Sequence, residues 1–266
     1  MSDVDAIHAL VQKRNQLKTE IAKIIVGQDD VIDQIVLSIF SGGHALLVGV
    51  PGLATTLMVN TLAQALGLDF KRIQLTPDLM PSDILGSEIL DENRHFKFIK
   101  GPIFSNIILA DEINRTPPKT QAALLEAMQE RAVTIAGHNY KLDLPYFVLA
   151  TQNPIEQAGT YPLPEAQLDR FMFAIKLDYP SFLEEVQVVK NTTSDVKLAI
   201  NPLFSTEEII EYQHLIRRIP VADNVIEYAV TLVSKTRPNN PLSNDYVKNY
   251  LDWGAGPRAS QNLIIA

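Results

Sequence analysis

The octapeptide Gly49-Val50-Pro51-Gly52-Leu53-Ala54-Thr55-Thr56 lies between an apolar run, residues 45–48, and a helix-forming segment, residues 57–66. A strand, a glycine-rich turn and a helix in this order are typical of a phosphate-binding loop. The backbone N–H groups of such a turn and the positive end of the helix dipole can hold a phosphate without distant side chains. We therefore expect all eight residues to bind the phosphates of a nucleotide.

Two positions of this loop depart from the pattern G-x-x-x-x-G-K-[ST]. Ala54 stands at the second glycine, and Thr55 stands at the lysine that reaches the β- and γ-phosphates. Thr56 supplies the hydroxyl that is expected to coordinate Mg²⁺. Because a threonine hydroxyl carries no positive charge, we expect hydrolysis of the nucleotide to be impaired.

The composition of the 266 residues indicates a folded protein without disulfide or thiolate chemistry. Apolar residues make up 46% of the chain, which can support packed cores, and cysteine is absent. Residues 1–5 lack the pattern of a signal peptide, and no apolar run approaches the roughly 20 residues of a membrane span. We therefore expect a cytoplasmic protein. The net charge of -8 argues against a broad nucleic-acid-binding surface.

Hydrophobic periodicity predicts strands that alternate with helices over residues 1–200, which is typical of a doubly wound parallel sheet. Hairpins are expected at 88–99 and around 133–142, whereas two prolines are expected to keep residues 76–83 irregular. From Pro202 only helical patterns remain, which predicts a helical lid over residues 201–266. The lid is expected to be incomplete, because Ala266 falls within an apolar helix pattern without a cap. The five expected strands are 45–48, 70–75, 107–110, 146–151 and 172–177.

Two adjacent carboxylates, Asp111 and Glu112, follow the apolar strand at residues 107–110. At the carboxyl end of a strand, one carboxylate can hold the Mg²⁺ shell while the other orients and deprotonates a water molecule. Taken alone, the pair could equally form a turn or cap a helix. Its position after a phosphate-binding loop favours the metal chemistry.

Several motifs, in the same order, resemble those of the MoxR family of AAA+ ATPases over almost the whole chain. An ordered set of motifs is far more specific than one glycine-rich loop. The resemblance implies a three-layer αβα nucleotide domain, a C-terminal helical lid, and a ring, usually hexameric, with ATP at the subunit boundaries. The motifs are Val26-Gly27-Gln28, Gly49 to Ala54, Thr76-Pro77-Asp78 with Pro81-Ser82-Asp83, Leu109 to Arg115, Ala150 to Pro154, Asp169-Arg170-Phe171 and Gly256-Pro257-Arg258.

The resemblance assigns catalytic roles around the two carboxylates. It implies that Asp111 and Thr56 bind Mg²⁺ and that Glu112 activates the attacking water. Asn153 matches the sensor that positions this water from the neighbouring strand. The structural alternative for Asn153, which precedes a proline, is that it initiates a turn.

Two arginines and one loop complete the site that the resemblance implies. Arg170 matches the arginine finger that one subunit offers to the γ-phosphate of the next, and Arg258 matches the lid sensor that closes over the nucleotide. A lone arginine is usually a solvated surface residue, so only the order of motifs favours these roles. Gly27 and Gln28 match the loop beside the adenine.

The resemblance implies a chaperone-like protein that uses ATP to remodel, mature or activate partner proteins. Such families commonly act with von Willebrand factor A domain proteins. A second hypothesis is a nucleotide-binding scaffold or ring subunit with little or no ATPase activity, because Thr55 replaces the lysine. A third is a nucleic-acid motor, against which the net acidity and the lack of a basic aromatic run both count.

Overall fold

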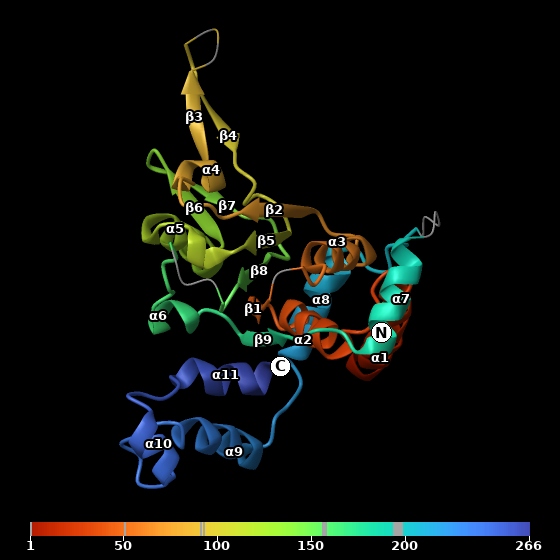
Figure 1. Cartoon of the computed structure of the whole chain (residues 1–266), viewed down its shortest axis with the longest axis vertical. Helices are drawn as coiled ribbons and strands as arrows, with labels where there is room; N and C mark the ends of the chain where they lie inside the picture. The colour runs from red at the N-terminus through yellow and green to blue at the C-terminus, as the bar shows by residue number, and fades with distance from the viewer. Residues whose placement is uncertain (1, 51, 91, 93, 156–158, 194–198) are drawn as a thin grey trace.

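The computed structural model describes residues 2–50, 52–90, 92, 94–155, 159–193 and 199–266. Its centre is a five-stranded sheet of order β2-β5-β8-β1-β9, in which all neighbouring strands are parallel (Figure 1). The expected five-stranded parallel sheet is therefore confirmed. The strands are β1 (Ala45–Gly49), β2 (Phe70–Gln74), β5 (Ile107–Asp111), β8 (Phe147–Gln152) and β9 (Phe173–Leu177).

Helices cover both faces of the sheet, because its strands carry apolar side chains on both faces. In β5, Ile107 and Leu109 belong to one buried cluster, whereas Ile108 and Ala110 belong to the other. This alternation follows the two-residue period of a strand. The first cluster is closed by α1 (Asp3–Ile21), α2 (Asp29–Phe40), α3 (Thr55–Leu66) and α8 (Thr206–Ile216), and the second by α5 (Pro118–Glu130); α7 (Phe182–Thr192) follows β9.

The strand order places a crevice at one end of the sheet. β1 lies between β8 and β9, whereas β2, the next sheet strand in the sequence, lies at the far edge. The direction of the chain across the sheet therefore changes beside β1. Open parallel sheets bind ligands at such a switch point, outside the carboxyl ends of the strands. The predicted phosphate-binding loop, which follows β1, lies at this place.

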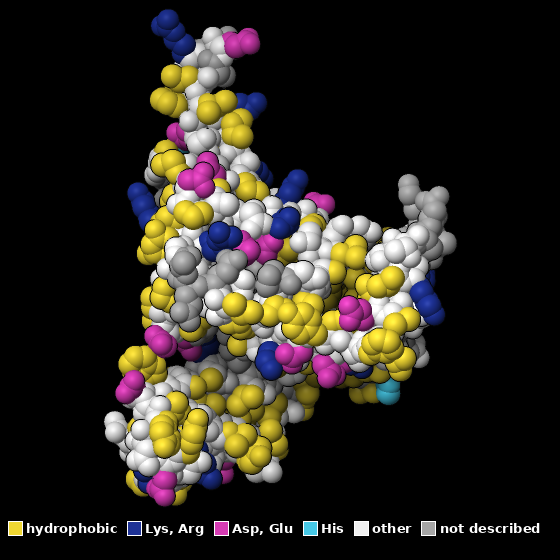
Figure 2. Space-filling model, in the orientation of Figure 1, with side chains coloured by type: hydrophobic (Ala, Val, Ile, Leu, Met, Phe, Trp, Pro, Cys, Tyr) yellow, Lys and Arg dark blue, Asp and Glu magenta, His cyan; other side chains and the backbone are white. Residues whose placement is uncertain are grey.

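Two antiparallel hairpins extend the fold beyond the sheet. Strands β3 (Gly86–Leu90) and β4 (Phe96–Lys100) form a long arm that projects from the body, and β6 (Ala132–Ile135) pairs with β7 (His138–Lys141) near its base (Figure 1). Phe98 anchors the arm by stacking on Tyr140, with ring centroids 4.2 Å apart. Phe96 is 75% exposed, so the arm presents apolar side chains to solvent (Figure 2).

A short helix, α4 (Pro81–Leu85), occupies part of the stretch that the sequence predicts to be irregular. The prediction for residues 76–83 is therefore wrong at its C-terminal end. Proline lacks an N–H group, but the first position of a helix needs none, so Pro81 begins the helix. The Asp83 carboxylate accepts a hydrogen bond of 2.8 Å from the Met80 N–H and caps it. Two other short elements are η1 (Ile113–Arg115) and α6 (Glu165–Leu168).

The C-terminal helices divide into two groups. In α8, Ile209, Tyr212 and Leu215 are buried in the same cluster as residues of α1 and α2. The remaining helices, α9 (Asp223–Ser234), α10 (Asp245–Tyr250) and α11 (Pro257–Ile265), form a separate group below the sheet (Figure 1). This packing favours a boundary after α8 rather than at residue 201, and we propose that the lid consists of α9 to α11. In the described ranges, no helix has the length and apolar character needed to cross a membrane.

His44 is a buried polar residue that ties β1 to its surroundings. Its Nδ1 accepts a hydrogen bond of 3.0 Å from the Val148 N–H, and its Nε2 lies 3.1 Å from the Met128 carbonyl oxygen. Because a carbonyl oxygen only accepts, Nε2 carries the proton and the ring is neutral. Burial, with a smaller effect of Arg131, lowers the pKa of His44 from 6.5 to about 4.

Acidification from about pH 8 to about pH 5 is expected to reduce the free energy of unfolding by about 2 kcal/mol through His44 alone. The unfolded chain takes up a proton below pH 6.5, whereas folded His44 stays neutral down to about pH 4. The loss of stability therefore begins as the pH falls through 6.5, the pKa of histidine in the unfolded chain, and is complete below about pH 4, the pKa of folded His44. Urea unfolding across this range checks the effect. His44→Gln should flatten the dependence and His214→Gln, an exposed control, should not; equal slopes in all three proteins contradict the assignment.

Candidate active site

The predicted phosphate-binding loop lines a cavity of about 310 Å³ at the carboxyl ends of the sheet strands. We call this cavity the phosphate cavity after this prediction. Gly52 and Ala54 both have a positive φ, +90° and +53°, and the chain enters α3 directly after them. This left-handed conformation is easiest for glycine, which explains why the loop pattern prefers glycine at residue 54. Pro51 lies outside the described residues. The other seven predicted loop residues line the cavity: Gly49, Val50, Gly52, Leu53, Ala54, Thr55 and Thr56.

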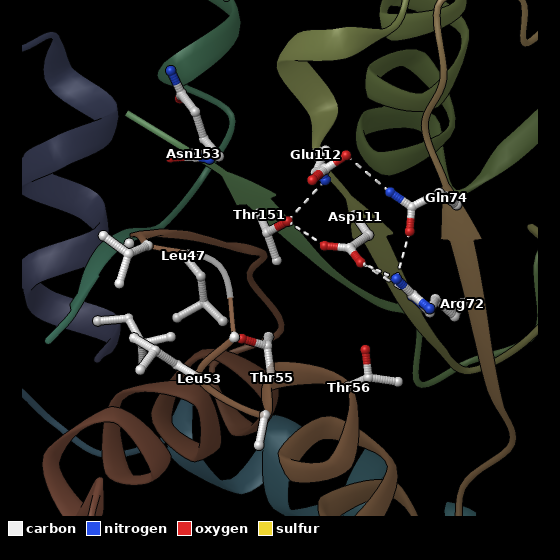
Figure 3. A pocket seen from close by; sticks show the side chains of 16 residues that line it. Leu47, Leu53, Thr55, Thr56, Arg72, Gln74, Asp111, Glu112, Thr151 and Asn153 are labelled. Carbon is white, nitrogen blue, oxygen red and sulfur yellow. Dashed lines mark hydrogen bonds and ion pairs between the residues drawn. The ribbon is translucent and has the colours of Figure 1, made fainter. Parts of the chain in front are cut away.

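Asp111, at the end of β5, is fixed by hydrogen bonds from both neighbouring strands (Figure 3). Its Oδ1 accepts a hydrogen bond of 2.6 Å from the Thr151 hydroxyl of β8. Its Oδ2 accepts two from Arg72 of β2, 3.1 Å from Nε and 2.6 Å from Nη2. The parallel register explains this convergence. Gln74 of β2 pairs with Asp111, and Arg72, two residues before Gln74, lies on the same face of the strand.

Glu112 follows Asp111 in a left-handed backbone conformation, with φ +59° and ψ +53°. Its N–H donates to the Thr151 hydroxyl at 2.8 Å, and its Oε2 accepts from Gln74 at 3.0 Å and from Arg115 at 3.1 Å. A non-glycine residue with this conformation is strained and persists where its surroundings hold it. The hydrogen bonds from Gln74 and Arg115 therefore hold the Glu112 carboxylate in the wall of the cavity.

The cavity offers suitable ligands for Mg²⁺. Thr56 and Asp111 both line it, and Figure 3 shows the Thr56 hydroxyl pointing toward the Asp111 carboxylate. Mg²⁺ prefers hard oxygen ligands and usually takes only one or two carboxylates, with water and phosphate oxygens completing its shell. One carboxylate and one hydroxyl fit that chemistry. A cluster of three or more acidic, histidine or cysteine side chains is not found in the described part of the chain, and such a site does not need one.

A second, smaller cavity of about 140 Å³ adjoins the first, since Gly52, Leu53 and Ala54 line both. Its other walls are mainly apolar and include Val26 and Gln28. The predicted adenine loop thus lies beside the phosphate cavity. Gln28 anchors this loop by donating a hydrogen bond of 3.0 Å to the Asp178 carbonyl oxygen.

Gly27 has φ +70°, and a Cβ added there would meet the Glu184 carboxylate of α7. Close approach to α7 and a left-handed backbone both favour glycine at this position. Gly27 therefore shapes the loop that carries Gln28.

Asn153 lines the cavity, but its side chain does not face the carboxylates. Its Oδ1 accepts a hydrogen bond of 3.0 Å from the Ile155 N–H, and Figure 3 shows the amide directed away from Glu112. The turn expected as the structural alternative is therefore present. The sensor role of Asn153 stays a prediction.

The two predicted arginines lie outside the walls of the phosphate cavity. Arg258 of α11 donates from Nη1 to the Asp169 carboxylate at 2.9 Å and to the Asp169 carbonyl oxygen at 3.1 Å. This contact joins the helical group to the residue that precedes Arg170. Arg170, which is half-buried, follows α6. The finger and lid-sensor roles stay predictions.

Four residues of the network have no role in the sequence-based prediction: Arg72, Gln74, Arg115 and Thr151. Arg72 and Gln74 alternate with the buried Ile73 in the edge strand β2, so their face could have been inferred from the period of two. Their contact with the carboxylates depends on strand order, which the sequence pattern does not give.

Comparisons with known proteins agree with this architecture. Residues 44–173 match the family model of the "ATPase family associated with various cellular activities (AAA)". "Uncharacterized protein YeaC" of Bacillus subtilis is 45% identical over all of this chain and 80% of its own length. "Chaperone MoxR1" of Mycobacterium tuberculosis is 44% identical over 93% of this chain, which spans 66% of that relative. The structure of a candidate ATPase from Cytophaga hutchinsonii has a TM-score of 0.88 and 44% identity, covering 96% of this chain and 78% of its own.

Proposed function

The chain belongs to the MoxR family of AAA+ ATPases. Because of this membership, we propose that the protein binds Mg-ATP and hydrolyses it. The energy of hydrolysis would serve to remodel, mature or activate partner proteins. The location of the protein in the cytoplasm stays part of the proposal.

The observation that carries the proposal is the pair of adjoining cavities that share the phosphate-binding loop. The apolar cavity suits a nucleobase, and the larger one places the N-terminus of α3 beside two adjacent carboxylates. A helix N-terminus favours the negative charge of phosphates. A nucleotide that spans both cavities would present its phosphates to Thr56, Asp111 and Glu112.

The residues divide the work of hydrolysis by their chemistry. Asp111 and Thr56 would hold Mg²⁺, which supplies charge neutralisation of the phosphates when it is bound. Glu112, held by Gln74 and Arg115, would orient the attacking water and accept its proton. Thr151 fixes both acidic residues, because its hydroxyl donates to Asp111 and accepts from the Glu112 N–H.

Thr55 favours the second candidate function, a nucleotide-binding scaffold or ring subunit with little or no ATPase activity. Thr55 lines the phosphate cavity at the position where the family pattern has lysine. The two functions share nucleotide binding and differ in turnover. Phosphate release from ATP by the purified chain, measured beside Glu112→Gln, tests the ATPase proposal directly.

The exposed hairpin arm supports a function in binding proteins. Ile89, Leu90 and Phe96 are between 47% and 75% exposed on β3 and β4. Exposed apolar side chains on a projecting element are typical of interaction surfaces. We include in the proposal a homo-oligomeric ring, hexameric by family resemblance, that acts on client or von Willebrand factor A domain proteins.

In such a ring Arg170 is expected to act on the nucleotide of the neighbouring subunit. Arg170→Ala and Glu112→Gln should each be inactive alone, whereas an equimolar mixture should recover about a quarter of the activity. The recovery reflects mixed head-to-tail interfaces that pair an intact Glu112 with an intact Arg170. Both substitutions are made in Thr55→Lys protein, so that turnover is measurable. Each variant alone at the same total concentration is the control, and a mixture no more active than its components contradicts action between subunits.

A further inference from the structure

Arg72 is the only cationic side chain among the described residues that line the phosphate cavity. The cavity also holds Asp111 and Glu112, so with both carboxylates ionised its side chains carry one positive and two negative charges. Because Thr55 replaces the lysine, the phosphate-binding loop adds no positive side chain. Beside the Mg²⁺ that Asp111 and Thr56 would hold, a cationic side chain in such a site would further offset the charge of a polyphosphate and of the carboxylates.

The contacts of Arg72 leave part of its guanidinium available. Nε and Nη2 donate to Asp111 Oδ2, and Nη2 also donates to Gln74 Oε1. Within the described residues, these contacts leave the two N–H groups of Nη1 for another acceptor. The side chain is 45% exposed, and Figure 3 shows the guanidinium above Thr56 at the start of α3.

We propose that Arg72 is a phosphate-binding residue that supplies, from strand β2, the positive charge that Thr55 does not. This inference rests on the proposed nucleotide function. A guanidinium is always charged, presents its donors in a rigid fork and is more weakly hydrated than an ammonium group. The ion pair with Asp111 holds Arg72 at the cavity wall, where Nη1 can bind a phosphate oxygen without loss of that pair.

A structural role for Arg72, that of keeping Asp111 in place, makes a different prediction. Under that role, the loss of Arg72 should weaken nucleotide binding equally whether residue 55 is threonine or lysine. If Arg72 binds phosphate, its loss should matter most when residue 55 is threonine, because a lysine there would supply the missing charge. A double-mutant cycle between the two positions separates these roles.

The cycle compares the parent, Arg72→Gln, Thr55→Lys and the double variant, with calorimetry of the full chain, Mg²⁺ and a non-hydrolysable ATP analogue. In the Thr55 protein, Arg72→Gln is expected to weaken binding of the analogue by about tenfold or more. In the Thr55→Lys protein, the same substitution is expected to weaken it by no more than about threefold. AMP, which lacks the β- and γ-phosphates, should bind the parent and Arg72→Gln alike. Lys71→Gln is the control, because it also removes one positive charge but from the opposite face of β2. It should leave the affinities for the ATP analogue and for AMP unchanged.

Effects that add within about twofold would overturn the inference and leave the proposed function standing, because the nucleotide would still be bound. An equal loss of AMP affinity would also overturn it. Failure of Thr55→Lys to bind the analogue would instead overturn the proposed function, and this inference with it. Urea unfolding checks that each variant is folded, and Arg72→Met, which keeps the aliphatic stem, replaces Arg72→Gln in the cycle if the latter does not fold.

Discussion

Glu112→Gln is expected to lower the rate of ATP hydrolysis by at least about 100-fold while nucleotide affinity stays within about threefold of the parent value. Glutamine keeps the shape of the side chain and an oxygen that can accept from Gln74 and Arg115, the two partners of Glu112. It cannot accept a proton from water. The substitution therefore removes the proposed base without removing the network around it.

The measurement is phosphate release at saturating ATP, paired with calorimetry for nucleotide affinity. It is made in the Thr55 protein and in Thr55→Lys, where turnover is expected to be higher. Glu227→Gln changes an exposed glutamate on α9 in the same way and should leave both quantities unchanged. If Glu112→Gln retains the parent rate, Glu112 is not the base, and its strained backbone requires another explanation.

The nucleotide domain could be predicted from the sequence because its signals are local. Apolar runs of four to six residues, separated by turn residues and helical patterns, give the five sheet strands within one or two residues of their observed bounds. The short helix α4 was missed because proline has opposite effects inside a helix and at its first position. Hydrophobic periodicity does not distinguish these positions when the helix is only five residues long.

The lid boundary that we propose, after α8, depends on packing rather than on helical pattern. α8 has the same amphipathic character as the helices that follow it, yet it packs on α2, where Gln213 donates a hydrogen bond of 2.7 Å to the Ile39 carbonyl oxygen. The sequence reveals that a helix has an apolar face but does not identify the surface that covers it. The position of α8 therefore follows only from the three-dimensional structure.

The family resemblance implied that Thr56 of the predicted phosphate-binding loop and Asp111 bind the same Mg²⁺, and the structure brings both residues to one cavity. The contacts of Arg72 were not predicted, because they require β2 to lie beside β5 in one particular register. The Asn153 side chain was expected near the attacking water, but a local turn holds it. Short-range hydrogen bonds of asparagine compete with distant partners in this way.

Thr55→Lys is expected to raise ATP turnover by about 10-fold to 150-fold, on the basis of about 1.5–3 kcal/mol for hydrogen bonds to a charged group. Residue 55 is the first residue of α3 and lines the cavity, so a lysine side chain there can enter the space beside the phosphates. Charge on the transferring phosphoryl group must be stabilised most strongly in the transition state. The gain should therefore appear mainly in kcat.

Nucleotide affinity should rise less than turnover, because the backbone of the loop and Arg72 already act on the ground state. Steady-state phosphate release gives kcat and KM, and calorimetry with a non-hydrolysable analogue gives the affinity. Thr55→Gln adds a long polar side chain without charge and serves as the matched control, so a gain that needs charge must be absent from it. If the Thr55 protein already hydrolyses ATP at the rate of Thr55→Lys, and Glu112→Gln abolishes both activities, the site is competent without the lysine. The missing charge would then not limit catalysis.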